Sequence, residues 1–164
     1  MTLVLIGPPG SGKTRLGKRV ARLLDLPFVD TDRLVVAEHG SIADIFATYG
    51  EPHFRRLERE AVSRALAETA VVSLGGGAVL DGDTRRELAG HRVALLTVDP
   101  EAVEARIGNG KRPLLTGGID SWKSLVETRR ELYESLGDRS WDTSSRPLDA
   151  IAQEIARWAK EGTP

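Results

Sequence analysis

The chain has 164 residues, 40% of them apolar and 29% charged, and these values are typical of one globular domain with its own core. A net charge of −1 gives no basic footprint for nucleic acid or a membrane surface, so we expect neither partner. The absence of cysteine excludes disulfides and thiolate metal sites. No apolar run is long enough to span a membrane, and an apolar strand candidate begins close to Met1. We therefore expect no signal peptide, a cytoplasmic location and, at this size, a monomer.

Residues 7–14 read G-P-P-G-S-G-K-T and directly follow an apolar segment at residues 3–6. A buried strand, a glycine-rich turn and the start of a helix form a phosphate-binding loop, because bare backbone N–H groups and the helix dipole both favour an anion. Lys13 is placed to reach the β- and γ-phosphates, and the Thr14 hydroxyl to bind Mg²⁺. Apolar residues recur at helical spacing after Lys13, which favours this interpretation over a glycine turn with an incidental lysine. The sequence predicts a nucleoside triphosphate site.

Short apolar segments alternate with amphipathic ones along the rest of the chain. Strands are predicted at residues 28–29, 71–74 and 93–96 and, more weakly, 140–142, and helices at residues 14–25, 54–68, 122–136 and 148–160. Shorter helices are predicted to begin after Asp99 and after Ser41, both of which are good N-caps. This alternation predicts an α/β protein, a three-layer α/β/α sandwich with a central five-stranded parallel sheet.

A glycine-dense segment separates two of the predicted helices, and Arg106 and Arg112 flank or enter it. Segments of this kind often serve as mobile lids in phosphate-transferring enzymes, although a plain surface loop has the same composition. The two arginines favour a lid.

Two acidic residues, Asp30 and Asp32, follow the predicted strand at residues 28–29. Ligands of open α/β sheets bind beyond the carboxyl ends of the strands, the edge where the phosphate loop also lies. One carboxylate could hold the water shell of a metal ion and the other could accept a proton, although two acids in a turn are commonly only solvated. Three glycines at residues 75–77 follow the next strand, either as backbone donors to a ligand or as a tight turn.

Arg129 lies in the apolar stripe of the helix predicted at residues 122–136, four residues after Leu125. The apolar members of this stripe are Trp122, Leu125, Val126, Leu132, Tyr133 and Leu136. A guanidinium on a buried face needs an anion, which is either a carboxylate of the protein or a ligand. Arg55 begins another helix and can pair with Glu58 one turn later, as many surface arginines do.

Taken together, these segments resemble the shikimate kinase family of small P-loop kinases. The resemblance covers nearly the whole chain. Beyond the phosphate loop, its most specific motifs are D-T-D at residues 30–32, S-I-A-D-I-F at 41–46, G-E-x-x-F-R at 50–55, S-L-G-G-G-A-V at 73–79 and R-P-L-L at 112–115. It implies a single kinase domain over residues 1–164, with a lid at about 107–119 and a helical substrate-binding segment at about 33–62.

The resemblance also implies an activity and a site. The family transfers the γ-phosphoryl of ATP, with Mg²⁺, to the 3-hydroxyl of shikimate in aromatic amino-acid biosynthesis. Asp32, Lys13 and Arg112 are then expected to be catalytic, with Asp32 as the base. The residues expected to bind substrate are Asp32, Arg55, Gly75, Gly76, Gly77, Arg129, Phe46, Phe54 and Glu58. Those expected to bind nucleotide are Gly10, Ser11, Gly12, Lys13, Thr14, Arg15, Arg106, Arg112, Arg146 and Pro147, with Thr14 and Asp30 at the metal.

Two other functions are compatible with parts of the sequence. A gluconate kinase would share the sandwich, the phosphate loop and a polyhydroxy acid substrate, but the three glycines and paired arginines favour shikimate. A nucleotide-binding switch would keep the loop without turnover, and the presence of the complete residue set argues against it.

Overall fold

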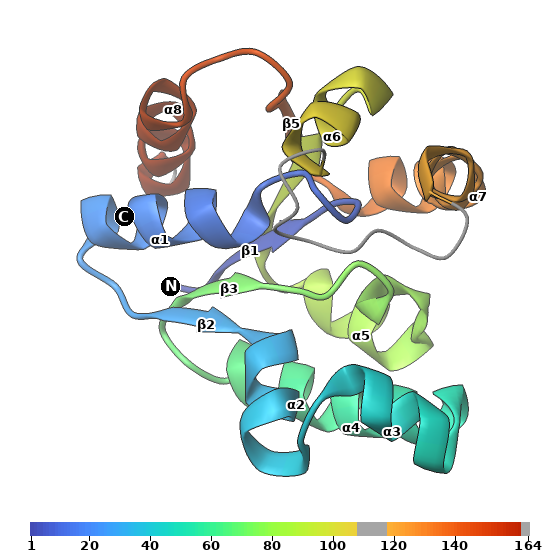
Figure 1. Cartoon of the computed structure of the whole chain (residues 1–164). Helices are drawn as coiled ribbons and strands as arrows, with labels where there is room; N and C mark the ends of the chain where they lie inside the picture. The colour runs from blue at the N-terminus through green and yellow to red at the C-terminus, as the bar shows by residue number, and fades with distance from the viewer. Residues whose placement is uncertain (108–117, 162–164) are drawn as a thin grey trace.

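A computed structural model describes residues 1–107 and 118–161 of the chain. Five parallel strands form one sheet: β1 (Leu3–Ile6), β2 (Phe28–Asp30), β3 (Val71–Ser73), β4 (Arg92–Thr97) and β5 (Arg139–Asp142). Their order is β2-β3-β1-β4-β5, with β1 at the centre (Figure 1). In the register, Leu5 of β1 lies opposite Ser73 on one side and Ala94 on the other. The predicted five-stranded parallel sheet is confirmed, including the weak fifth strand.

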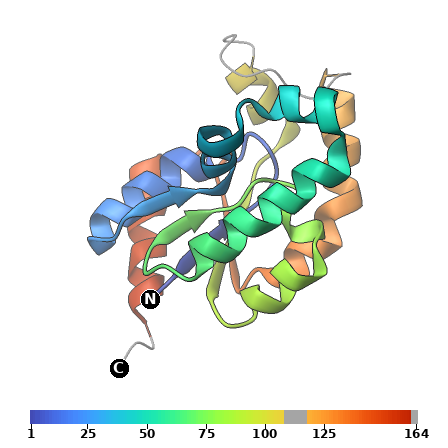
Figure 2. The ribbon, with the colours of Figure 1, turned by 90° about the horizontal axis from the view of Figure 1, so that it is seen from below.

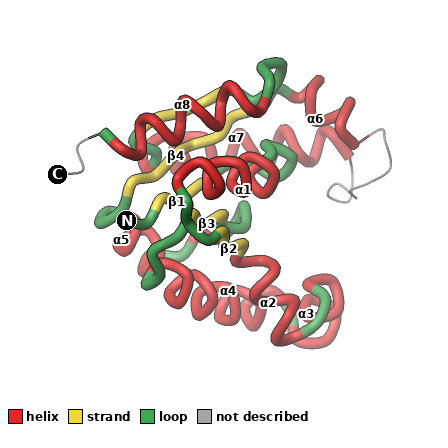
Figure 3. Tube along the Cα trace, turned by 90° about the vertical axis from the view of Figure 1, so that its left-hand side faces the viewer, coloured by secondary structure: helices red, strands yellow, loops and turns green. Residues whose placement is uncertain are grey.

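Helices cover both faces of the sheet, as predicted for a sandwich. On one face α1 (Lys13–Leu24) packs beside α8 (Leu148–Lys160) (Figure 3). Leu3 and Leu5 point to this face, where they contact residues of both helices. The opposite face, reached by Val4 and Ile6, is covered by α4 (Glu51–Leu66), α5 (Gly82–Leu88) and α7 (Gly118–Leu136). All residues of β1 are buried, and alternate side chains point to opposite faces of the sheet, so each face has its own hydrophobic core.

Three helices form most of the segment predicted to bind substrate. These are α2 (Thr31–His39), α3 (Ile42–Tyr49) and the first turns of α4, held together by Val35, Ile45, Phe54 and Ala61. At the start of α3, Ser41 Oγ accepts a hydrogen bond from Asp44 N at 3.1 Å, so this predicted N-cap is confirmed. The helices α2 and α3 lie at the same end of the molecule as α6 (Pro100–Ile107) (Figure 2).

The residue patterns predicted neither α5 nor the short 3₁₀ helix η1 (Ala78–Leu80), and α2 was expected only as part of the helical segment at about 33–62 that the resemblance implied. Both α-helices begin after an aspartate that caps two backbone N–H groups: Asp30 for α2 and Asp81 for α5. The sequence analysis considered Asp30 only as a candidate metal ligand and did not consider it as the N-cap of a helix. Among the described residues, no helix is long and apolar enough to cross a bilayer.

Candidate active site

The phosphate loop connects β1 to α1 and adopts conformations that only glycine tolerates well. Gly10 and Gly12 have φ values of 81° and 89°, in the left-handed region. At Gly7 a Cβ atom would lie 2.4 Å from the carbonyl oxygen of Leu96 in β4. The glycines of the motif therefore let the loop turn sharply against the sheet, which is the geometry expected of an anion cradle.

Lys13 and Thr14 begin α1 and face the loop and β2, respectively. Lys13 Nζ donates hydrogen bonds to the carbonyl oxygens of Gly7 at 2.8 Å and Pro8 at 3.1 Å, so its ammonium group lies against the loop. Thr14 Oγ1 donates to Asp30 Oδ2 at 2.9 Å, while the other carboxylate oxygen of Asp30 caps α2. The structure thus brings the two predicted metal-binding residues together between the first turn of α1 and the end of β2.

Asp32 lies in the first turn of α2, where its half-buried carboxylate is close to several charges. Burial, followed by the negative charge of Asp30, raises the pKa of Asp32, while Lys13 and Arg55 act in the opposite direction. A carboxylate with a raised pKa at the carboxyl edge of a parallel sheet is well suited to accept a proton from a hydroxyl group.

The three glycines at residues 75–77 lie against the charged side chains that the sequence singled out. A Cβ at Gly75 would lie 2.5 Å from Asp32 Oδ1, and a Cβ at Gly77 would lie 2.4 Å from Arg55 Nη1. A Cβ at Gly76 would be 3.7 Å from Arg129 Nη1. The glycines therefore allow one aspartate and two arginines to approach the same stretch of backbone.

Arg55 and Glu58 form a partly buried ion pair on α4. Arg55 Nη1 donates to Glu58 Oε1 at 2.8 Å, and only 4% of Glu58 is exposed. Burial raises the pKa of Glu58, and Arg55 opposes that effect; Asp32 and Arg129 also act electrostatically on Glu58. The expected pairing is confirmed. Arg55 Nε and Nη2 also donate to Glu51 Oε1 at 3.4 Å, so two glutamates hold the guanidinium beside Gly77.

Arg129 is half-buried on α7, and its neighbour Tyr133 provides a contact that the sequence analysis missed. Tyr133 Oη donates to the carbonyl oxygen of Gly76 at 2.7 Å. Burial raises the pKa of Tyr133, an effect opposed by its hydrogen bond with Arg129. Tyr133 had been assigned only to the apolar stripe of the helix. A signal was present nonetheless, because a buried tyrosine hydroxyl needs a polar partner.

Thr31 is a second residue that the sequence analysis overlooked. Its buried hydroxyl accepts a hydrogen bond from the Gly75 backbone N–H at 3.2 Å and donates to the Ser73 carbonyl at 3.4 Å. The middle residue of D-T-D therefore fixes the glycine segment relative to α2. Nearby, the rings of Phe46 and Phe54 lie 5.0 Å apart; Phe46 is exposed and Phe54 is buried. The two rings give this end of the molecule an apolar wall.

The residues predicted to bind nucleotide are not all at the loop. Arg106 Nη1 donates to the Gly10 carbonyl at 2.7 Å, and its guanidinium also contacts the Thr143 carbonyl. Arg15 is exposed on α1, whereas the Ser11 side chain is completely buried, so the Ser11 hydroxyl does not face a ligand. Arg146 pairs with Glu154 of α8, and Pro147 is the N-cap of that helix. Arg112 and most of the predicted lid lie outside the described residues.

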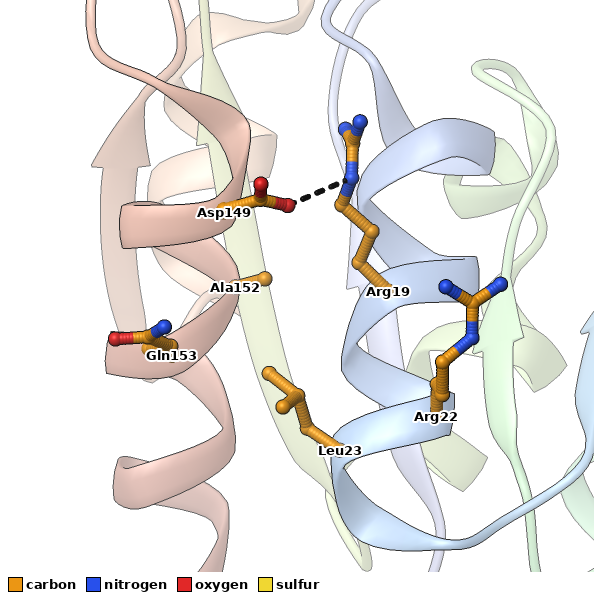
Figure 4. A pocket seen from close by; sticks show the side chains of 6 residues that line it. All are labelled: Arg19, Arg22, Leu23, Asp149, Ala152 and Gln153. Atoms are coloured by element: carbon orange, nitrogen blue, oxygen red, sulfur yellow. Dashed lines mark ion pairs between the residues drawn. The ribbon is translucent and has the colours of Figure 1, made fainter.

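A cavity of about 250 Å³ lies between α1 and α8 (Figure 4). It is lined by Arg19, Arg22, Leu23, Asp149, Ala152 and Gln153. Arg19 Nε already pairs with Asp149 at 3.0 Å. Arg22 follows Lys13 by nine residues, which corresponds to roughly 13 Å along the helix. This cavity is therefore separate from the phosphate loop.

Comparisons with known proteins identify one family of relatives. A family model described as shikimate kinase matches residues 9–160. A shikimate kinase of Streptomyces avermitilis is 45% identical over 157 residues, covering 93% of this chain and 92% of the relative. One from Salinispora arenicola is 47% identical over 158 residues, covering 93% and 94%. The structure of Acinetobacter baumannii shikimate kinase in complex with shikimate matches with a TM-score of 0.87 and 27% identity, covering 96% of this chain and 91% of that one.

A gluconokinase from Sinorhizobium meliloti matches with a TM-score of 0.67 and 20% identity, covering 97% of this chain and 93% of that one, a likeness that concerns the fold alone. The family model matches residues 9–160, a range that contains the D-T-D motif, the three glycines and residues 9–14 of the phosphate loop. The two curated relatives are 45% and 47% identical, and each match covers 93% of the chain. The chain therefore belongs to the shikimate kinase family.

Proposed function

We infer that the protein transfers the γ-phosphoryl group of ATP to the 3-hydroxyl group of shikimate, giving shikimate 3-phosphate and ADP. One observation carries this inference beyond the family. Asp32, Arg55 and Arg129, which come from three different helices, all approach the glycine segment at residues 75–77. Two guanidinium groups and one carboxylate around bare backbone suit a small substrate that carries both a carboxylate and hydroxyl groups.

In this proposal, Arg55 and Arg129 bind the substrate carboxylate, and the backbone around Gly76 contacts a hydroxyl group. The Arg55–Glu58 pair supports the first role, since Glu58 orients the guanidinium. The longer 3.4 Å bonds from Arg55 to the exposed Glu51 would be exchanged for bonds to the substrate carboxylate. Phe46 and Phe54 would line the ring of the substrate, as their contact at one end of the molecule suggests.

Asp32 is proposed to accept the proton of the attacking hydroxyl group. Its raised pKa is consistent with this role, because a base is most effective when its pKa approaches the working pH. Lys13 would neutralise charge on the transferring phosphoryl group, as would Arg112. Phosphoryl transfer demands mainly positioning and charge neutralisation from the protein.

A magnesium ion is proposed to bind at the Thr14 hydroxyl, with Asp30 acting through water. The fit rests on two adjacent oxygen donors, Thr14 Oγ1 and Asp30 Oδ2, which lie 2.9 Å apart at the start of α1. Mg²⁺ is usually held by one or two protein oxygens together with phosphates and water, so a larger acidic cluster is not required. When bound, the ion would supply positive charge that offsets the negative charge of the triphosphate.

The expectations of a monomer, of a cytoplasmic location and of no nucleic-acid or membrane partner rest on size, charge and composition. They stay predictions, and light scattering during gel filtration would test the first of them.

The decisive experiment measures ADP release with shikimate and with gluconate in parallel. We expect ATP turnover that depends on shikimate and is at background level with gluconate. Turnover with gluconate alone would replace the substrate assignment, and ADP binding without turnover on either acid would favour a nucleotide-binding switch.

A further inference from the structure

The carbonyl groups of the phosphate loop accept hydrogen bonds from side chains of other elements. After the Gly7 and Pro8 carbonyls, which contact Lys13, the next three carbonyls each accept one such bond at 2.7 Å. The donors are Trp122 Nε1 to Pro9, Arg106 Nη1 to Gly10 and Thr143 Oγ1 to Ser11. Five consecutive carbonyl groups are thus held by side chains, and of their donors only Trp122 comes from α7.

The hydrogen bond of Trp122 has a consequence for the opposite side of the loop. A trans peptide group is planar, so its C=O and N–H bonds point in opposite directions, and the described residues contain no cis peptide. When the indole holds the Pro9 carbonyl, the N–H of Gly10 is aimed away from α7. An N–H group with this orientation is the kind of donor that a phosphate cradle uses.

Trp122 is itself fixed in place. Only 1% of its surface is exposed, and it packs with Val98 and Val103 in a small buried cluster. The same cluster supports the loop, because a Cβ at Gly10 would contact Val103 Cγ1 at 3.4 Å. The buried indole N–H is satisfied by the Pro9 carbonyl, so neither group depends on water.

We propose that Trp122 is a positioning residue for the nucleotide: its indole N–H orients the Pro9–Gly10 peptide so that the Gly10 N–H meets a phosphate of ATP or ADP. The proposal rests on the proposed function for the identity of the ligand. It extends that function because the sequence pattern placed Trp122 only in the apolar stripe of α7, with no connection to nucleotide.

The test is Trp122→Phe, which keeps an aromatic ring in the cluster and removes the N–H donor. We expect the Kd for ADP, measured by calorimetry, to rise about five- to tenfold, because the Pro9 carbonyl loses its buried partner and the peptide can rotate. The KM for shikimate should change less than about twofold, since Asp32, Arg55 and Arg129 contact other parts of the backbone.

Trp158→Phe is the matched control. Trp158 lies on α8 and packs against Trp141 with ring centroids 5.3 Å apart, far from the loop in the fold. This variant should keep the wild-type Kd for ADP. An unchanged Kd in folded Trp122→Phe would overturn the proposal. So would a loss of ADP and shikimate affinity in equal proportion with a lowered melting temperature, because that pattern indicates a structural role only.

A second measurement observes ADP binding in the wild-type protein and uses the variants only to assign signals. The chain has three tryptophans, so ¹⁵N-labelled wild-type protein should give three indole N–H resonances, which the two variants assign. Addition of ADP should shift the Trp122 resonance more than the other two, and a Trp122 resonance that ADP leaves in place would contradict the proposal. The calorimetric Kd and the resonance shift both use ADP alone. Absence of shikimate phosphorylation would therefore refute the proposed function without deciding this inference.

Discussion

Replacement of Gly75 by alanine should separate catalysis from nucleotide binding. The added Cβ would lie 2.5 Å from Asp32 Oδ1, 3.0 Å from Cγ and 3.1 Å from Oδ2. Non-bonded contacts to carbon are most favourable at about 3.5–4.0 Å, so the carboxylate must move by roughly 1 Å. The backbone cannot easily yield instead, because the Gly75 N–H is held by Thr31 Oγ1 at 3.2 Å. Gly75 has no positive φ, so backbone strain does not contribute.

A displacement of about 1 Å at a reacting group can cost on the order of 10²-fold in rate, and we expect kcat for shikimate to fall by about that factor. The Kd for ADP should stay within about twofold of the wild-type value, since the phosphate loop is unchanged. Both are measured alongside a thermal melt.

The control for this variant is Gly90→Ala, since a Cβ at Gly90 would meet its nearest atom, the carbonyl oxygen of Glu87, at an ordinary 3.6 Å. It should retain wild-type activity. A Gly75→Ala protein that melts normally and keeps kcat within about threefold would refute the argument that this glycine makes room for the base.

Four further predictions concern the charged groups. Asp32→Asn should lower kcat by about 10²- to 10⁴-fold, the usual contribution of a positioned base, and a loss of only a few-fold would remove that role. The same variant should melt at a higher temperature at pH 7. The folded state raises the pKa of Asp32 above 3.8, so the wild-type protein loses stability as the pH rises from 3.8 to the pKa of the folded state. Asn carries no charge and does not cause this loss. An unchanged or lower melting temperature of the variant would contradict the expected direction of the pKa shift. In a pH profile, kcat/KM for shikimate should decline on the acid side with a midpoint above 3.8, and a midpoint at or below 3.8 would exclude Asp32 as the titrating base. Arg129→Lys keeps the charge but loses the planar fork, so the KM for shikimate should rise about tenfold or more, whereas an unchanged KM would reduce Arg129 to a structural residue.

Local sequence patterns were sufficient for most of the fold. The apolar segments identified β1, β3 and β4 readily, because strands buried in a parallel sheet demand near-continuous apolar residues. The edge strand β5 gave only a weak signal, since its sequence is R-S-W-D and Trp141 is its one buried residue. The residue patterns missed helix α2 because its N-cap, Asp30, lies in a motif with a second use as a candidate ligand. Helix α5 is only seven residues long, too short for a convincing apolar period.

The sequence by itself determined the nucleotide loop, the order of strands and helices along the chain and the charged residues worth attention. Only the tertiary structure decided their contacts, such as Thr14 with Asp30 and Tyr133 with the Gly76 carbonyl. The physical reason is that helical and strand periodicities report each residue's immediate neighbours. The contact between Trp122 and Pro9, 113 residues apart, depends instead on the strand order β2-β3-β1-β4-β5 and on the packing of α7 against it, which no local pattern specifies.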